Sequence, residues 1–241
     1  MTVVSIRHLT VRYPDGNLAL REIAGDIEPN ETVGIVGPNG AGKTTLFLCL
    51  AGVLPVPAGT IEVAGLNLAS AHQRRLLPTK LGIVFQDSED QLFGSTVVED
   101  VAFGPLNLGL SVAAARERAA EALHHVSLDG LEERVPFHLS GGEKRRVALA
   151  GILAMKPEVL LLDEPSSQLD PRGRRQLIDL VNRLPGTRLM ATHDLELVLQ
   201  TCARTWLLDE GWLIADGPTS SILADKALME RHGLEVPYSL R

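Results

Sequence analysis

Short apolar stretches divide this chain into strands and helical segments, and their spacing distinguishes the two. In Val3–Val11 apolar and polar side chains alternate, and a second strand is expected within Leu18–Ile27. Alternation of this kind predicts half-buried strands, and Pro14–Gly16 supplies a turn between them. Thr32–Val36 is a short apolar run that leads into a glycine-rich loop. The chain therefore opens with a strand pair and a buried strand before its first helix.

Beyond this loop, short apolar strands alternate with segments of helical pattern. Strands that alternate with helices indicate a mainly parallel sheet with both faces covered. We expect strands at Thr60–Ala64, Gly82–Phe85, Val159–Leu162, Arg188–Ala191, Thr205–Leu208 and Trp212–Ala215, and helices at Lys43–Gly52, Arg172–Leu184 and Leu195–Cys202.

The stretch 97–155 departs from this alternation because it contains consecutive helical segments. They are Val97–Leu108, Ala113–Val126 with Ser111 as N-cap, and Gly142–Met155. Val147–Met155 contains no charged residue, so we expect this end to be buried on all sides. We therefore predict one α/β domain over residues 1–241, with a helical subdomain at about 97–155 and a short helical tail at about 218–241.

Composition and charge exclude several classes of protein. The chain has 241 residues, 45% hydrophobic and 22% charged, which is typical of a globular domain and not of a disordered chain. Its net charge is −7, so it lacks the basic surface of a nucleic-acid-binding domain, and we expect no nucleic-acid partner. A local site for phosphate groups remains compatible with this charge.

The sequence predicts neither a signal peptide nor a membrane-spanning helix. The N-terminal residues have Arg7 and Arg12 in place of a continuous apolar region. The uncharged run Thr44–Ile61 contains prolines and glycines, whereas a spanning helix needs about 20 mostly apolar residues. Cys49 and Cys202 are isolated in the sequence and are expected to be buried thiols in a reducing compartment.

A glycine-rich loop between a predicted strand and a predicted helix matches the phosphate-binding pattern GxxxxGK[ST]. Its backbone N–H groups and the helix N-terminus would surround a polyphosphate. Lys43 would reach the β- and γ-phosphates, and the Thr44 hydroxyl would hold Mg²⁺. The alternative is an ordinary glycine-rich turn. The loop consists of Gly37, Pro38, Asn39, Gly40, Ala41, Gly42, Lys43 and Thr44.

Two carboxylates follow the apolar strand Val159–Leu162. Asp163 and Glu164 stand where a parallel strand delivers its C-terminal end to a ligand crevice. Asp163 would bind Mg²⁺ through water, and Glu164 would polarise an attacking water as a general base. The alternative is an acidic turn at the end of a strand.

A second candidate anion site lies in Leu139–Glu143, at the start of a predicted helix. Ser140 offers a hydroxyl, and Gly141 and Gly142 offer unobstructed N–H groups at the positive end of that helix. The alternative is a helix N-cap with a flexible entry. A second phosphate site is explained most simply if it serves a nucleotide held by another subunit.

Taken in order, these motifs make residues 3–217 resemble an ATP-binding cassette (ABC) ATPase. In this resemblance Tyr13 stacks on adenine, Gln86 is the Q-loop glutamine, and His193 is the switch histidine. Without the other motifs, each of these three residues would be interpreted as an ordinary aromatic, amide or histidine side chain. Ser140, Gly141, Gly142 and Glu143 match the signature, and Ser166–Asp170 matches the D-loop. Gln168 departs from the family, which often has glycine there.

The resemblance implies a P-loop NTPase cassette with a mainly parallel core sheet, an N-terminal antiparallel β part and a helical subdomain. Two cassettes, expected to be a homodimer, would bind head to tail and enclose two ATP molecules. Each ATP would contact residues 37–45, including Thr45, of one subunit and the signature of the other. Glu164 and His193 would be catalytic. Thr44, Gln86 and Asp163 would hold Mg²⁺.

Three stretches further resemble energy-coupling-factor importers, including those for cobalt and nickel. They are Val84–Phe93, Val101–Pro105 and Lys144–Ala148. The resemblance implies a transmembrane coupling subunit and a small membrane substrate-binding subunit as partners, at the cytoplasmic face of the cell membrane. Gln91–Phe93 and its surroundings would form the groove for a coupling helix. Alternatively, Asp87–Asp90 is a solvated acidic loop.

Other functions remain as alternatives at this point. The ATPase of a vitamin importer such as a biotin transporter, or an ABC exporter subunit, would share these motifs. Non-transport ABC ATPases carry a long coiled coil between the positions of Gln86 and Ser140, and the 53 residues here are too few. Translation-type ABC factors have two cassettes in one chain, and small-molecule kinases lack Leu139–Glu143.

Overall fold

The core of the molecule is a mainly parallel sheet in the order β10-β9-β3-β8-β7-β6. The computed structural model describes residues 2–241, apart from the side chains of Ser88 and Glu89. The central strand β3 lies parallel to β8 on one side and to β9 on the other. The strands are β3 (Thr32–Val36), β6 (Leu81–Val84), β7 (Val159–Asp163), β8 (Thr187–Ala191), β9 (Arg204–Asp209) and β10 (Trp212–Pro218).

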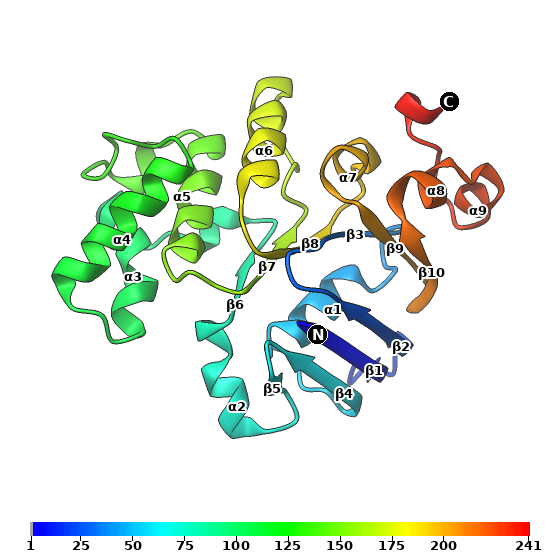
Figure 1. The fold of residues 1–241 in the computed structure, drawn as a ribbon. Coiled ribbons are helices and arrows are strands. Elements are labelled where there is room, and N and C mark those ends of the chain that lie inside the picture. The colour runs from blue at the N-terminus through cyan, green and yellow to red at the C-terminus, as the bar shows by residue number, and fades with distance from the viewer. Residues whose placement is uncertain (1) are drawn as a thin grey trace.

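A second sheet, in the order β2-β1-β4-β5, is antiparallel and packs beneath the core sheet (Figure 1). Helix α1 (Lys43–Leu50) lies between the two sheets. Its buried Phe47 belongs to one apolar cluster with Ile6, Ile35 and Trp206 from both sheets. The strands are β1 (Val4–Arg12), β2 (Leu18–Ile27), β4 (Ala58–Val63) and β5 (Leu66–Asn67).

Helices α3, α4 and α5 form a separate group beside the β6 edge of the core sheet (Figure 1). They are α3 (Val97–Asn107), α4 (Val112–His125) and α5 (Gly141–Leu153). Thr96, Ser111 and Ser140 cap them, each with a side-chain oxygen that accepts from a backbone N–H of the first turn. The short helix α2 (Ala71–Leu76) follows β5.

The remaining helices cover the other face of the core sheet (Figure 1). These are α6 (Pro171–Arg183) and α7 (Leu195–Thr201), followed by α8 (Thr219–Ala224) and α9 (Lys226–Arg231). The last residues return to α7, where the Ser239 hydroxyl donates to the Glu196 carboxylate at 2.7 Å.

The predicted α/β fold is confirmed, with two corrections to the expected details. Helix α2 was not expected, because its six residues are too few for a recognisable period. The predicted all-round burial of Val147–Met155 is wrong, since Ile152 and Met155 are only half-buried. Both line a surface cavity next to α3, so within the described part of the chain this apolar face has no neighbouring element over it.

Two further expectations concern the membrane and the cysteines. Among the described residues, no helix is long and apolar enough to cross a membrane. Cys49 and Cys202 are buried free thiols, and burial raises the pKa of each to about 11. Both side chains therefore stay protonated and pack as small apolar groups.

Candidate functional site

The glycine-rich loop joins the carboxyl end of β3 to α1 and leaves no room for side chains at two of its positions. A Cβ on Gly37 would lie 2.0 Å from the Leu208 carbonyl oxygen. Gly42, the N-cap of α1, has a φ of 104°, and a Cβ there would lie 2.7 Å from the Ala19 carbonyl oxygen. Glycine is therefore required at both positions, and the loop can turn its N–H groups toward a bound anion.

Lys43 begins α1 and is buried against the loop that precedes it. Its Nζ donates to the carbonyl oxygens of Gly37 at 2.7 Å and Pro38 at 3.0 Å. Burial lowers the pKa of Lys43, while the nearby carboxylates of Glu164 and Asp163 act in the opposite direction. The ammonium group thus lies in the loop itself, next to two carboxylates.

Thr44 and Asp163 bring two oxygen donors together at the carboxyl ends of β3 and β7. The Thr44 hydroxyl donates to Asp163 Oδ2 at 3.2 Å. Burial, with some contribution from Glu164, raises the pKa of Asp163, and the Thr44 hydrogen bond partly offsets this. Hydroxyl and carboxylate oxygens suit Mg²⁺, which usually binds one or two protein groups and completes its shell with phosphate and water. The pair therefore fits a magnesium ion that enters with a nucleotide.

Glu164 follows Asp163 in a left-handed conformation, with a φ of 45°. Its Oε2 accepts a hydrogen bond from the Thr192 hydroxyl at 3.0 Å and lies 2.8 Å from His193 Nδ1. The Glu164 side chain is 12% exposed and that of His193 is 67% exposed. This left-handed conformation directs the carboxylate toward the loop that follows β8 and contains His193, here called the switch loop. There the carboxylate contacts His193.

Tyr13 approaches the same region from the end of β1. Its hydroxyl lies 3.1 Å from the hydroxyl of Thr45 on α1, within hydrogen-bonding distance. A cavity of about 610 Å³ opens here. Of the predicted ATP and catalytic residues, it is lined by Tyr13, Asn39, Gly40, Ala41, Gly42, Lys43, Thr44, Thr45, Gln86 and Glu164.

The cavity also contains residues that the sequence analysis missed. Arg21, Asn17 and Ala19 come from the β1–β2 turn and β2, and Glu210 from the turn after β9. The Arg21 side chain donates to the Glu210 carbonyl oxygen at 3.0 Å, although the two are 189 residues apart. No local sequence pattern marks such residues, since only the packing of β2 against β10 brings them to the cavity.

The signature residues lie elsewhere, in a second cavity of about 700 Å³. Ser140–Glu143 lines this cavity together with Gln168 and Asp170, and none of these is found among the described residues of the first cavity. Gln86 lines both. A single chain thus separates the signature from the phosphate-binding loop.

The signature residues form the helix N-cap that was the alternative interpretation, but the entry to the helix is fixed and not flexible. Ser140 Oγ accepts from the Glu143 backbone N–H at 3.4 Å, and Glu143 Oε2 accepts from the Ser140 N–H at 2.8 Å. These hydrogen bonds from Ser140 lower the pKa of Glu143. The capping box rigidifies the start of α5 and leaves Gly141 exposed.

The D-loop connects β7 to α6 and forms part of the second cavity. Asp170 caps α6, with Oδ1 accepting from the Gly173 N–H at 2.6 Å. Gln168 has a φ of 61°, which is the conformation that glycine adopts at least cost. The family glycine at this position therefore has a backbone reason, and Gln168 occupies the same conformation with some strain.

Comparison with known proteins agrees with this geometry. Residues 20–167 match the family model for the ABC transporter ATP-binding domain. The chain belongs to this ABC transporter family. It is 53% identical, over 98% of its length and 97% of the relative's, to a putative ABC transporter ATP-binding protein of Gloeobacter violaceus. It is 46% identical to the energy-coupling factor transporter ATP-binding protein EcfA of Methanothermobacter thermautotrophicus, over 98% and 77% of the two chains.

Solved structures of cassettes share the fold. CbiO1 from Clostridium perfringens, part of the ABC transporter complex CbiONQ, aligns with a TM-score of 0.85 and 35% identity, covering 95% of this chain and 94% of that one. The cassette MJ0796, a dimer in a post-hydrolysis state with ADP and phosphate, aligns with a TM-score of 0.81 and 25% identity over 90% and 98%. The chain is an ATP-binding ABC ATPase whose hydrolysis is coupled to transport.

Proposed function

We propose that this ATPase powers an energy-coupling-factor importer for cobalt or nickel ions. The likeness to EcfA and to CbiO1, part of the CbiONQ transporter complex, supports the transporter class. The metal cargo is proposed from the resemblance of Val84–Phe93, Val101–Pro105 and Lys144–Ala148 to importers that include those for cobalt and nickel. We place the subunit at the cytoplasmic face of the cell membrane, bound to a transmembrane coupling subunit and, through it, to a small membrane substrate-binding subunit.

The separation of the signature from the phosphate-binding loop carries the proposal of a homodimer. A complete ATP site needs both Lys43 and Ser140, but in one chain they line different cavities. Two copies placed head to tail would combine the loop of one copy with the signature of the other. The dimeric MJ0796 cassette supports this arrangement.

Within each composite site, the residues of this chain have distinct tasks. Lys43 and the loop N–H groups bind the phosphates, and Tyr13 stacks on the base. Glu164 accepts the proton of the attacking water, as its position beside the loop allows. His193, which contacts Glu164 Oε2 at 2.8 Å, orients that carboxylate and the γ-phosphate. Thr44, Asp163 and Gln86 would hold a magnesium ion, which when bound would neutralise charge on the phosphates.

The proposed docking groove for the coupling subunit lies between α3, α5 and the segment that follows β6. A cavity of about 370 Å³ opens there, lined by apolar side chains that include Phe93, Phe103 and Met155. Phe93 is 65% exposed and packs edge-on against Phe103, with ring centroids 4.7 Å apart. Large exposed aromatics beside an apolar groove are typical of a surface that another helix covers.

A buried carboxylate in this groove adds a chemical requirement. Asp100 is 8% exposed, and its Oδ1 accepts from the N–H groups of Phe93 at 2.9 Å and Gly94 at 2.7 Å. Its buried Oδ2 has no hydrogen-bond partner among the described residues. Leaving such an acceptor unsatisfied is costly. Because this atom is inaccessible in the isolated chain, a docking helix could donate a hydrogen bond to it only if Asp100 or its neighbours moved.

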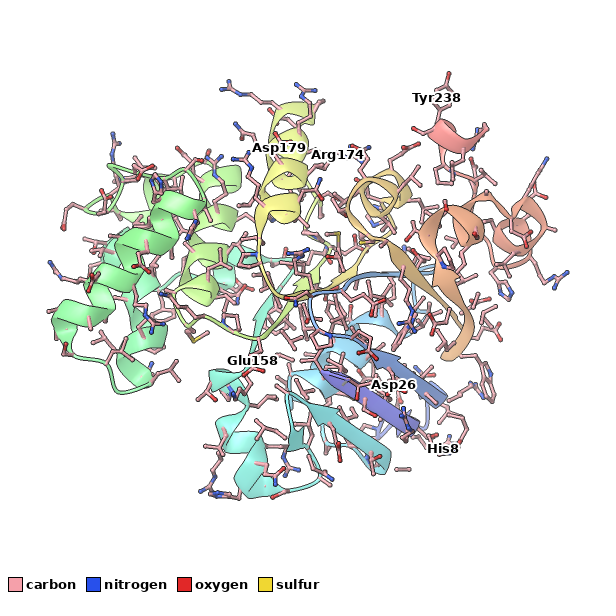
Figure 2. All side chains as sticks on the ribbon, viewed as in Figure 1. His8, Asp26, Glu158, Arg174, Asp179 and Tyr238 are labelled. Carbon is pink, nitrogen blue, oxygen red and sulfur yellow. The ribbon has the colours of Figure 1, made fainter. Side chains whose placement is uncertain are left out.

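Co-expression with the membrane subunits tests the proposal. Phe93→Ser should reduce co-purification with the coupling subunit and cobalt uptake, while ATP affinity of the isolated subunit stays unchanged. Tyr238→Ser is the matched control, because Tyr238 is an 83% exposed aromatic at the far C-terminal end (Figure 2). Equal membrane association of both variants would contradict the docking groove, and uptake of a vitamin but not of cobalt would contradict the cargo.

A further inference from the structure

Arg145 of α5 holds two loops that lie far apart in the sequence. Its Nη1 donates to the Pro165 carbonyl oxygen at 3.0 Å and also to the Ser167 carbonyl oxygen. Its Nη2 donates to the Gln86 carbonyl oxygen at 3.0 Å. The acceptors are all main-chain atoms, so the guanidinium fixes the backbone of the D-loop and the Q-loop relative to the signature helix.

The chemistry of this side chain suits the task. Arg145 is half-buried, and its planar guanidinium directs several donors at fixed angles, which lysine cannot do. Burial lowers the pKa of Arg145 and Asp87 opposes this, but an arginine stays charged at neutral pH. Hydrogen bonds from a charged donor are stronger than neutral ones.

The two loops belong to different halves of the nucleotide site. Gln86 lines the cavity of the phosphate-binding loop and also the signature cavity, whereas Ser167 and Gln168 line the signature cavity. Helix α6, which directly follows the D-loop, is attached to the switch loop. Arg174 of α6 forms a two-point ion pair with Asp194, at 2.7 and 2.9 Å (Figure 2 marks Arg174).

We propose that Arg145 is a positioning residue that locks the D-loop and Q-loop to the signature helix, so that the surface offered to the second copy is preformed. The inference deepens the proposed function, because it rests on ATP-driven pairing of two copies. Arg145 lines the signature cavity and, among the described residues, is not part of the lining of the phosphate-binding cavity. Its contacts to the D-loop have no counterpart in that cavity, and of the residues described only Gln86 belongs to both cavities. Loss of Arg145 should therefore weaken closure of the dimer more than binding of ATP to one copy.

Arg145→Gln in a Glu164→Gln background tests this, because slow hydrolysis lets the closed dimer accumulate. Size-exclusion chromatography across a Mg-ATP titration should place the dimerisation midpoint about tenfold higher than in Glu164→Gln alone. Affinity for a fluorescent ATP analogue should change by much less than the dimerisation midpoint. Hydrogen–deuterium exchange should become faster at residues 86–91 and 165–170, and Arg145→Lys should restore part of each effect.

Arg188→Gln is the matched control. Arg188 is also a half-buried arginine with two hydrogen bonds, at 3.0 and 2.6 Å to the Thr32 hydroxyl, but it lies at the other end of the sheet strands. If Arg145→Gln shows the control's dimerisation midpoint and exchange rates and loses only thermal stability, the inference is wrong. If Arg145→Gln does not fold, the same comparison is made with Arg145→Lys. Failure of the Glu164→Gln parent to dimerise would instead contradict the proposed homodimer.

Discussion

The cavity of the phosphate-binding loop and the cavity of the signature differ in how they are supported. In the first, Lys43 and Thr45 are buried on α1, and Asp163, which hydrogen-bonds to Thr44 of the cavity lining, is buried at the end of β7. In the second, Ser140, Gly141 and Asp170 are exposed at the N-termini of α5 and α6. Their hydrogen bonds are made mostly within their own first helical turn. The buried groups of the first cavity are fixed by the core, whereas those of the second are exposed and rigid, as the proposed pairing of two copies requires.

The largest effect is expected on catalysis in the first cavity. Glu164→Gln should reduce ATP turnover by about 10²–10⁴-fold, since it removes the proposed general base. ATP affinity should stay intact, and a dimer should accumulate with Mg-ATP in size-exclusion chromatography. Glu196→Gln, which changes a carboxylate bonded to Ser239, is the control. Turnover at the wild-type rate in Glu164→Gln would exclude this carboxylate as the base.

A mixing experiment tests whether the two cavities serve one ATP across an interface. Lys43→Ala should lose nucleotide affinity, whereas Ser140→Arg should bind ATP normally and fail to close. In a mixed dimer both changes fall on one composite site and the other site is complete, so turnover should rise at least about tenfold above either parent. Recovery of turnover can come only from donation across the interface.

A mixture without recovery has two explanations: the two sites fire only together, or the dimer is not head to tail. A control must distinguish them. A tandem fusion of the wild-type chain to the double variant Lys43→Ala, Ser140→Arg supplies that control. In a head-to-tail arrangement, the damaged phosphate-binding loop and the damaged signature of this fusion contact different ATP molecules, so each composite site carries one change. Turnover in this fusion together with no turnover in the mixture would contradict the head-to-tail arrangement.

A smaller effect is expected on the free energy of unfolding, through the buried carboxyl group of Asp163. Because burial raises the pKa of Asp163, the folded state holds this proton more tightly than the unfolded state does. Stability therefore falls as the pH rises through the folded pKa, and the ionised carboxylate destabilises the protein at pH 7. Asp163→Asn should increase the free energy of unfolding by about 1 kcal/mol, which corresponds to a melting temperature higher by about 2–4 °C. The same variant should lose Mg-dependent turnover.

Differential scanning calorimetry between pH 4 and pH 8 checks this prediction. The difference in melting temperature between wild type and Asp163→Asn should grow as the pH rises, because only the wild type becomes ionised at this position. A difference that is constant with pH, or a lower melting temperature of the variant at pH 7, would show that Asp163 is not destabilising in the folded protein.

Local signals in the sequence were sufficient for most elements. Thr32–Val36 forms a strand and Lys43 starts a helix, as expected, because a short apolar run and a glycine-rich loop act within a few residues. Ser111 caps α4 for the same reason. The motif residues of the first cavity lie at strand ends, so their convergence followed from the parallel sheet.

Burial and long-range contacts were beyond the reach of such signals. Val147–Met155 was expected to be buried because it is apolar, but burial depends on which element covers a face, and the groove face of Ile152 and Met155 is left open by the described elements. The hydrogen bonds of Arg145 to Gln86 and Ser167 join residues 59 and 22 positions apart.

The sequence by itself determined the class of this protein. Glycines, a lysine and paired carboxylates at fixed spacing specify phosphate chemistry, and Leu139–Glu143 separates the chain from kinases. Only the tertiary structure decided that Lys43 and Ser140 line different cavities and that Gln86 lines both. The reason is physical: spacing along the chain controls turns and helix starts, whereas the position of a helix such as α5 beside the sheet results from packing of many side chains at once.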